Sequence, residues 1–178
     1  MSDVRPTDMN QRRATPTVRA GNYRVDPEKS GITFRAKAFG LLWVHGSIPA
    51  AEGAIGVVDG QLNAEGELAA DELSTRLAPR DWHLRTSHYL YTRAHPRISV
   101  SIDSARLGTG EAECTVIVRD TPSVVPVTVT SIEAVDGALH IEATAVVDRK
   151  PFPMLGSWAG VSRRVHISVS LVARPTDV

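Results

Sequence analysis

Polar and apolar residues alternate through most of the chain after about residue 20. Over residues 32–38, isoleucine, phenylalanine and two alanines occupy every second position, and threonine, arginine and lysine fill the positions between them. The same period returns over 98–103 and 165–173. A strand with one buried face and one solvated face has this pattern. The pattern predicts strands at 23–27, 32–38, 43–48, 54–58, 61–69, 98–103, 114–118, 125–132, 139–147 and 165–173.

Turn-forming residues separate these segments. Asp59-Gly60 and Asp136-Gly137 are dipeptides that favour two-residue hairpin turns, and Gly108 to Gly110 supplies another turn. Roughly eight to ten short strands at this spacing indicate an all-β antiparallel fold, either a barrel or a sandwich. A membrane barrel is disfavoured because the strands are short, aromatic girdles are missing and no export signal is visible.

Length and composition predict a single domain. The 178 residues suffice for one hydrophobic core, which we place at 21–174, whereas residues 1–20 have little to bury and are expected to form a disordered tail. The single Cys114 excludes an internal disulfide and a cysteine-built metal site. No apolar run approaches the ~20 residues of a membrane helix, so no integral membrane segment is expected. The start of the chain lacks a secretory apolar core, which predicts a cytoplasmic location.

Charge excludes some partners. The 20 basic and 20 acidic residues give a formal net charge of zero. This balance provides no electrostatic footprint for nucleic acid or for an anionic membrane. A homodimer is left open as a partner.

One segment interrupts the alternation. Residues 80–96 concentrate aromatic, cationic and imidazole side chains, with Pro79 suited to a first helical turn and Pro96 suited to ending a helix. We therefore expect a short helical insert near residues 79–95 in a β scaffold. Such an insert suggests the mouth of a site.

The chemistry of this insert remains open. His83, His88 and His95 have no standard metal-ligand spacing, so no metal site is predicted. No nucleophile motif is present, and Cys114 lies at a core-like position. Asp81, near the helix start, could complement the helix dipole and pair with an arginine, or the segment could contact an anion or head group beside an apolar opening.

Three motifs resemble the YceI-like family. The segment from Arg80 to Leu90 reads Arg-Asp-x-His-Leu-Arg-Thr-x-x-Tyr-Leu and is followed by His95-Pro96, similar to the family's Arg-Asp-x-His-Leu-Arg-Ser-x-Asp-Phe-Leu. The opening Tyr23-x-x-Asp-Pro-x-x-Ser-x-x-x-Phe34, with Gly46 downstream, resembles the family's first two strands. Asp148-Arg149-x-x-Phe152 is similar to its motif before the last strand. The resemblance spans about residues 22–173.

This resemblance implies an extended lipocalin-like antiparallel barrel of about eight strands with a hollow, apolar interior. It implies a non-enzymatic protein that binds, carries or sequesters a long isoprenoid lipid, such as an isoprenoid quinone or prenyl phosphate. No other cofactor is expected. The aromatic residues Phe34, Trp43, Phe152 and Trp158 would otherwise be expected in a filled core. The residues expected to line or gate the cavity are Phe34, Trp43, Trp82, Leu84, Tyr89, Ile98, Val100 and Phe152, and those expected to meet a polar head are Arg80, His83 and Arg85.

Several positions depart from the family pattern. Lys29 and Ala38-Phe39 stand where relatives often carry histidine, His88 replaces an acid, Tyr89 replaces phenylalanine and Pro153 replaces glycine. These departures bear on the head-group contacts. Two alternatives remain: a solid-core interaction domain, and a small-molecule enzyme using His83 with Asp81 as acid and base.

Overall fold

The computed structural model describes residues 18–154 and 160–176, and this part of the chain is mostly strand. The helical elements are the α-helix α1 and two short 3₁₀ helices: α1 (Ala78–Leu84), η1 (Pro27–Lys29) and η2 (Ala70–Glu72). The strands are β1 (Gly21–Val25), β2 (Gly31–Ala38), β3 (Leu42–Val58), β4 (Gln61–Ala69), β5 (Arg97–Arg106), β6 (Gly110–Val118), β7 (Thr121–Val135), β8 (Ala138–Asp148) and β9 (Arg164–Pro175).

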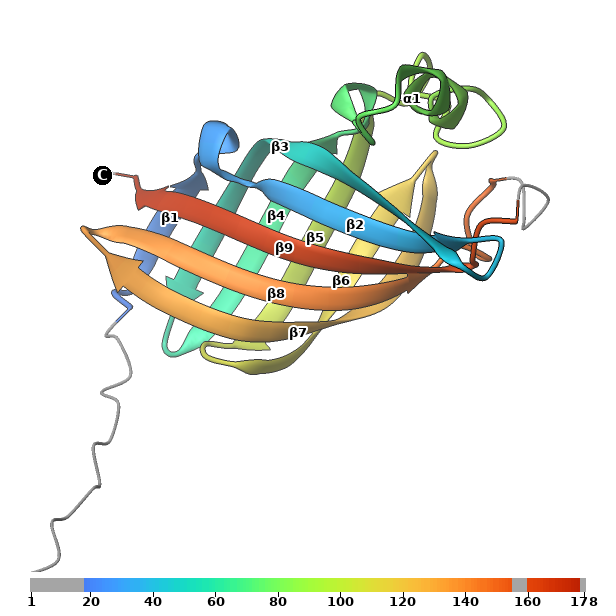
Figure 1. Cartoon of the computed structure of the whole chain (residues 1–178). Helices are drawn as coiled ribbons and strands as arrows, with labels where there is room; N and C mark the ends of the chain where they lie inside the picture. The colour runs from blue at the N-terminus through green and yellow to red at the C-terminus, as the bar shows by residue number, and fades with distance from the viewer. Residues whose placement is uncertain (1–17, 155–159, 177–178) are drawn as a thin grey trace, which may run out of the picture.

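The strands form a closed antiparallel barrel. Their order in the sheet is β1-β3-β2-β9-β8-β7-β6-β5-β4, and a further pairing of β3 with β4 closes the ring. β1 is an extra strand that pairs with both β3 and β9. The predicted antiparallel barrel is therefore confirmed, and closure of the ring decides against a sandwich (Figure 1).

The two predicted hairpin dipeptides form the β3–β4 and β7–β8 turns. Asp59 and Gly60 have φ of 49° and 73°, and Asp136 and Gly137 have φ of 50° and 80°. Both residues of such a turn need positive φ, which aspartate tolerates and glycine adopts freely. The β6–β7 turn uses Arg119-Asp120 with φ of 50° and 61°, and without a glycine the sequence did not reveal it.

The predicted division of residues 43–58 into two strands is wrong. β3 runs unbroken through Pro49, with a register shift between Ala50 and Glu52 where it pairs with β4. The backbone N–H groups of Ser47 and Ala50 point to opposite sides of the strand, toward Ser74 and Ser30. Pro49 lies two residues after Ser47, so its nitrogen faces the same side of the strand as the Ser47 N–H. The pairing of β3 with β4 begins only at Ala50, so no hydrogen bond of the sheet is lost at Pro49.

The insert is less helical than expected. α1 ends at Leu84, and residues 85–96 continue as turns that are closed by local backbone bonds, such as Leu90 N–H to Leu84 O at 3.0 Å. Among the described residues, no helix has the length and apolar character required to cross a bilayer.

The two ends of the barrel are packed differently. At the end that carries β1, hereafter the β1 end, a core of buried side chains fills the interior: Tyr23, Val25, Ala50, Ile55, Val57, Leu62, Ile132, Leu139, Ile141 and Ala173. α1 lies over the other end, hereafter the α1 end, where the β2–β3, β6–β7 and β8–β9 connections also lie (Figure 1). The solid packing at the β1 end confines any hollow to the α1 half.

Candidate functional site: an apolar cavity beneath α1

A cavity of about 470 Å³ occupies the α1 half of the barrel. Its wall comes from the inward positions of the strands, including Ile32 and Phe34 of β2, Ile98 and Val100 of β5, and Ile167 of β9. The strand alternation that the sequence predicted produces this wall, since each strand turns every second side chain inward. The interior is therefore hollow at one end, contrary to the alternative of a solid-core domain.

Small residues leave the space open. Ala36, Ala38 and Ala145 line the cavity where larger side chains would fill it. Phe34 lies directly across from Gly46 in the β2–β3 pair, and any Cβ at position 46 would overlap the phenyl ring. Gly46 thus lets Phe34 lie flat against the wall.

Cys114 belongs to the same wall. It is buried and lines the cavity, as its core-like position predicted. Burial raises the pKa of the Cys114 thiol, and a backbone hydrogen bond at Ser101 only partly opposes this shift. A neutral thiol behaves as a small apolar group, so Cys114 adds to the apolar lining.

Asp81 fixes α1 to the chain before it. Its carboxylate, only 9% exposed, accepts hydrogen bonds from the backbone N–H of Thr75 at 2.7 Å and from the Thr75 hydroxyl. The guanidinium of Arg80 donates to the Thr75 hydroxyl oxygen at 2.7 Å and to the Thr75 carbonyl at 3.0 Å. Arg85 donates to the Leu73 carbonyl at 2.6 Å. These bonds hold α1 against residues 73–75.

The charge of Asp81 makes this attachment dependent on pH. Burial raises the pKa of Asp81, but the hydrogen bonds from Thr75 and the positive charges of Arg85 and Arg80 outweigh it, so the pKa lies below its ordinary value of 3.8. A depressed pKa contributes stability that is fully present above pH 3.8 and is lost as the pH falls through the lower, folded-state pKa.

We therefore expect Asp81→Asn to weaken the acid sensitivity of the fold. Asparagine cannot take up the proton, so wild type should exceed the variant in free energy of unfolding at about pH 6, and the gap should narrow below about pH 4. Urea unfolding at several pH values measures both curves. Curves that stay parallel over this range would show that Asp81 is not the responsible group.

Arg119 bridges three segments at the α1 end. Its Nη1 donates to the carbonyls of Ser87 at 2.9 Å and Tyr89 at 3.0 Å, and also to the carbonyl of Pro153. The guanidinium also lies 5.5 Å from the ring centre of Tyr91. Sequence reasoning missed Arg119, since nothing along the chain indicates which carbonyls it reaches.

Arg149 is the second arginine that borders the cavity beside Arg80. Its Nε donates to the Ser162 carbonyl at 3.2 Å and its Nη2 to the Val161 carbonyl at 3.1 Å. It thus connects the end of β8 to the chain that leads into β9. The family-like motif at 148–152 contained Arg149, but its role as a connector was not anticipated.

Most residues expected at the cavity do line it. Those in the lining are Phe34, Leu84, Tyr89, Ile98, Val100, Phe152, Arg80 and His83. The expected lining by Trp43 and Trp82 is wrong. Trp43 is 40% exposed on the outer face, between Arg35 and Lys37 and edge-on to His166, whereas its neighbour Val44 faces the cavity. Trp82 is 71% exposed on the outer side of α1.

The sequence contained a signal for Trp43. Counting every second residue back from the apolar Ile48 reaches Gly46 and Val44, so strict alternation places Trp43 on the outer face with His45. Trp158, also expected in the core, lies outside the described residues.

The expected head-group residues differ in their surroundings. Arg80 borders the cavity with its guanidinium bonded to Thr75, and Arg85 is outside the lining and bonded to Leu73. His83 lines the cavity and packs edge-on against Tyr89, with ring centres 5.1 Å apart. Asp81 is bonded to Thr75, so the structure does not assemble an acid–base pair of Asp81 and His83.

The departures from the family pattern lie in different places. Lys29, in η1, is exposed and outside the cavity lining, and His88 is exposed in the turns after α1. Tyr89 is buried and lines the cavity, and Phe39 lines it as well. Pro153 contributes its carbonyl to Arg119. Only Tyr89 and the Ala38-Phe39 pair therefore contact the cavity.

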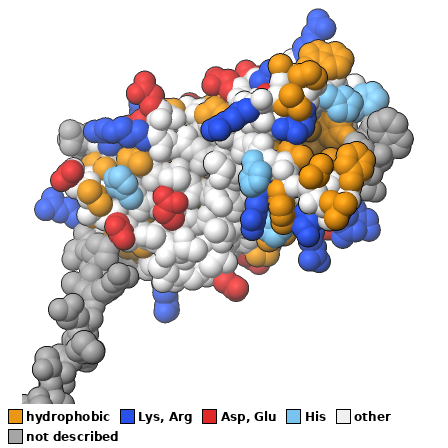
Figure 2. All heavy atoms as spheres, viewed as in Figure 1, with side chains coloured by type: hydrophobic (Ala, Val, Ile, Leu, Met, Phe, Trp, Pro, Cys, Tyr) orange, Lys and Arg blue, Asp and Glu red, His pale blue; other side chains and the backbone are white. Residues whose placement is uncertain are grey.

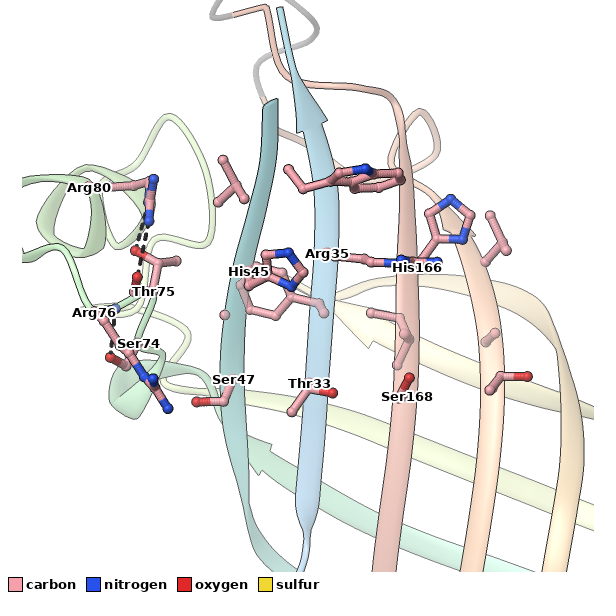
Figure 3. A pocket seen from close by; sticks show the side chains of 18 of the residues that line it. Thr33, Arg35, His45, Ser47, Ser74, Thr75, Arg76, Arg80, His166 and Ser168 are labelled. Carbon is pink, nitrogen blue, oxygen red and sulfur yellow. Dashed lines mark hydrogen bonds between the residues drawn. The ribbon is translucent and has the colours of Figure 1, made fainter. Parts of the chain in front are cut away.

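A second hollow lies on the outer face of the barrel. It is an open groove of about 1170 Å³ beside the segment 74–80, and Figure 3 shows Arg35, His45 and His166 side by side on β2, β3 and β9. Its wall mixes polar and apolar side chains, so it offers a hydrocarbon chain a less continuous apolar surface than the barrel cavity does. The described residues contain no cluster of histidine, cysteine or acidic side chains able to hold a metal ion.

A closed antiparallel barrel with an apolar hollow under a short helix has a lipocalin-like architecture. A sequence profile described as YceI-like domain matches residues 23–173, nearly all of the barrel. The chain therefore belongs to the YceI-like family, as its motifs predicted. No curated protein matches the chain in sequence.

Solved structures share the fold at low sequence identity. BcnA of Burkholderia cenocepacia has a TM-score of 0.71 and 14% identity, over 83% of this chain and 98% of that one. A polyisoprenoid binding domain from Saccharophagus degradans, implicated in plant cell wall breakdown, has a TM-score of 0.64 and 11% identity, over 89% and 100%. The YceI protein of Campylobacter jejuni has 0.55 and 14%, over 75% and 86%. At these identities the likeness concerns the fold alone.

Proposed function

We propose that this protein binds a long-chain isoprenoid lipid in its barrel cavity and carries or sequesters it without catalysis. The observation that carries the proposal is the cavity beneath α1, whose wall is apolar except at a few positions near its mouth. The similarity to a polyisoprenoid binding domain supports the same class of ligand.

The size and dryness of the cavity suit a hydrocarbon chain. Its volume of about 470 Å³ falls in the range of roughly 300–1,000 Å³ typical of small-molecule sites. Apolar cavities as small as about 150 Å³ stay dry and accept apolar compounds. Each Å² of apolar surface removed from water contributes about 25 cal/mol, so a prenyl chain gains affinity without specific polar contacts.

The polar groups around the cavity favour a ligand whose buried part is uncharged. The guanidinium groups of Arg80 and Arg149 each donate two hydrogen bonds to protein oxygens, which use two of the five N–H donors of each group. A head group would stay at the α1 end, near His83 and Phe39, which line the cavity and are exposed. This setting suits the neutral head of an isoprenoid quinone, and the basic side chains around the α1 end would equally attract the charged head of a prenyl phosphate.

Native mass spectrometry of gently purified protein, followed by lipid extraction, tests the proposal. We expect a complex heavier than the polypeptide by the mass of one isoprenoid lipid, and that lipid in the extract. Redox-sensitive ultraviolet absorbance identifies a quinone, and phosphorus content identifies a prenyl phosphate. A polypeptide that never carries or takes up an isoprenoid, even when offered one in detergent, would refute the proposal.

A further inference from the structure

The formal net charge of zero conceals an uneven distribution. The loops and strand ends at the α1 end present exposed basic side chains: Lys37, Arg76, Arg93, Lys150, Arg163 and Arg164. The turns at the β1 end instead present Asp59, Glu111, Glu133 and Asp136. The barrel is therefore positive at its cavity mouth and more negative at its filled end.

The acidic groups at the α1 end are largely engaged. Asp81 is buried against Thr75, Asp71 pairs with Arg97 at 2.6 Å, and Asp148 pairs with Arg163 at 2.6 Å. Asp120, in the β6–β7 turn, lies 3.5 Å from the imidazole of His95. Arg163 is offset by Asp148, but Lys37, Arg76, Arg93, Lys150 and Arg164 outnumber the exposed Glu72, so positive charge is in excess around the mouth.

Apolar side chains project from the same end. In the β2–β3 hairpin, Phe39 is 74% exposed and Leu41 is 85% exposed, and Leu42 next to them is also exposed. Trp82 and Leu77 are exposed on or just before α1. Figure 2 shows hydrophobic side chains gathered around a hollow at the right-hand end, with lysine and arginine side chains beside them.

Phe39 connects this surface to the cavity. It lines the cavity although most of its side chain is exposed, so the hairpin tip forms part of the mouth. Its φ is 52°, and its N–H donates to the Gly160 carbonyl at 2.6 Å. The surface of exposed apolar and basic residues is therefore continuous with the hollow.

We infer that the α1 end is a docking surface for an anionic lipid bilayer, with the hairpin tip Phe39–Leu42 inserted at the interface. The hydrocarbon interior of an anionic bilayer takes up exposed apolar residues, and its negative head groups attract the lysine and arginine residues that flank them. Tryptophan, as at position 82, prefers this interface. Docking in this way would set the cavity mouth against the bilayer. The inference depends on the surface alone and not on which ligand the cavity holds.

Charge argues against a symmetric dimer formed through this surface. Two α1 ends that faced each other would bring like charges together, and such contacts are disfavoured. A negatively charged bilayer supplies both the apolar depth and the opposite charge.

Flotation of the full chain with vesicles tests the inference. We expect binding to vesicles of phosphatidylcholine mixed with phosphatidylglycerol, weak binding to phosphatidylcholine alone, and loss of binding in high salt. Leu41→Ser with Leu42→Ser should weaken binding at least about tenfold, because interfacial affinity follows the apolar area buried. Arg93→Glu with Lys150→Glu should weaken binding to the anionic vesicles selectively.

Matched controls lie at the other end of the barrel. Val58→Ser and Arg106→Glu change an exposed apolar and an exposed basic residue there and should leave vesicle binding unchanged. Equal binding to neutral and anionic vesicles, or equal losses in these controls, would overturn the inference. The inference would also be overturned if the protein bound no vesicles but associated with itself in a salt-sensitive way, and if the hairpin substitutions abolished that self-association. Because the lipid extracted from the cavity is assayed separately, failure of docking is distinguishable from failure of ligand binding.

Discussion

Ala145→Phe should reduce the amount of bound isoprenoid at least about tenfold while leaving the barrel folded. Ala145 faces the cavity from β8, between Val127 of β7 and Ile167 of β9. A phenyl ring at this position would occupy space that the ligand chain needs. Because the ring enters a hollow and not a filled core, it avoids the overpacking that destabilises dense interiors.

The neighbouring residue supplies the control. Val146 is the next residue of β8 and is exposed on the outer face, so Val146→Phe adds a similar ring outside the cavity. We expect normal lipid content for that variant by extraction and native mass spectrometry, with thermal unfolding as the check on folding. Undiminished lipid in Ala145→Phe would place the ligand elsewhere on the protein.

Arg119→Met should lower the free energy of unfolding by about 1.5 kcal/mol, the low end for hydrogen bonds from a charged donor, since these carbonyls are exposed or only partly buried. The side chain of Arg119 bonds the carbonyls of Ser87, Tyr89 and Pro153 together. Methionine keeps much of the apolar stem and removes the donors. The loosened α1 end should also release ligand faster.

Arg93→Met is the matched comparison, because Arg93 lies in the insert that Arg119 contacts and its side chain is exposed. Urea unfolding should show a change within about 0.5 kcal/mol for that variant. Ligand release can be followed by transfer to acceptor vesicles. Equal stability of the two variants would mean that the bridge made by Arg119 contributes little.

The distribution of charge over the barrel leads to a different expectation for membrane binding than the overall composition does. Equal numbers of acidic and basic residues suggested no attraction to anionic membranes. The hairpins, however, bring Lys37, Lys150 and Arg164 to one end of the barrel and Asp59 and Asp136 to the other. A sum over the sequence cannot report such a separation, since it depends on which turns share an end.

The sequence by itself determined most of the strands, their inward faces and the family, but not the continuity of β3 through Pro49. Alternation has a period of two residues, and turns such as Asp59-Gly60 depend on local φ preferences, so both are encoded in neighbouring residues. The same alternation also indicated the outward position of Trp43, although its large aromatic side chain had suggested the cavity or the core. The motif at 80–90 indicated the family because its residues are contiguous in the sequence and can be recognised without the folded structure.

Only the tertiary structure decided where the barrel is hollow, because that depends on which inward side chains from distant strands meet. The packing around Leu139 fills the β1 end, whereas Ala36, Ala38 and Ala145 leave the α1 end open. Likewise, Arg80 and Asp81 suggested a site for an anion, but folding brings Thr75 to both of them. A side chain's partners depend on the closed chain, and its residue type alone does not reveal whether it binds a ligand or holds the fold together.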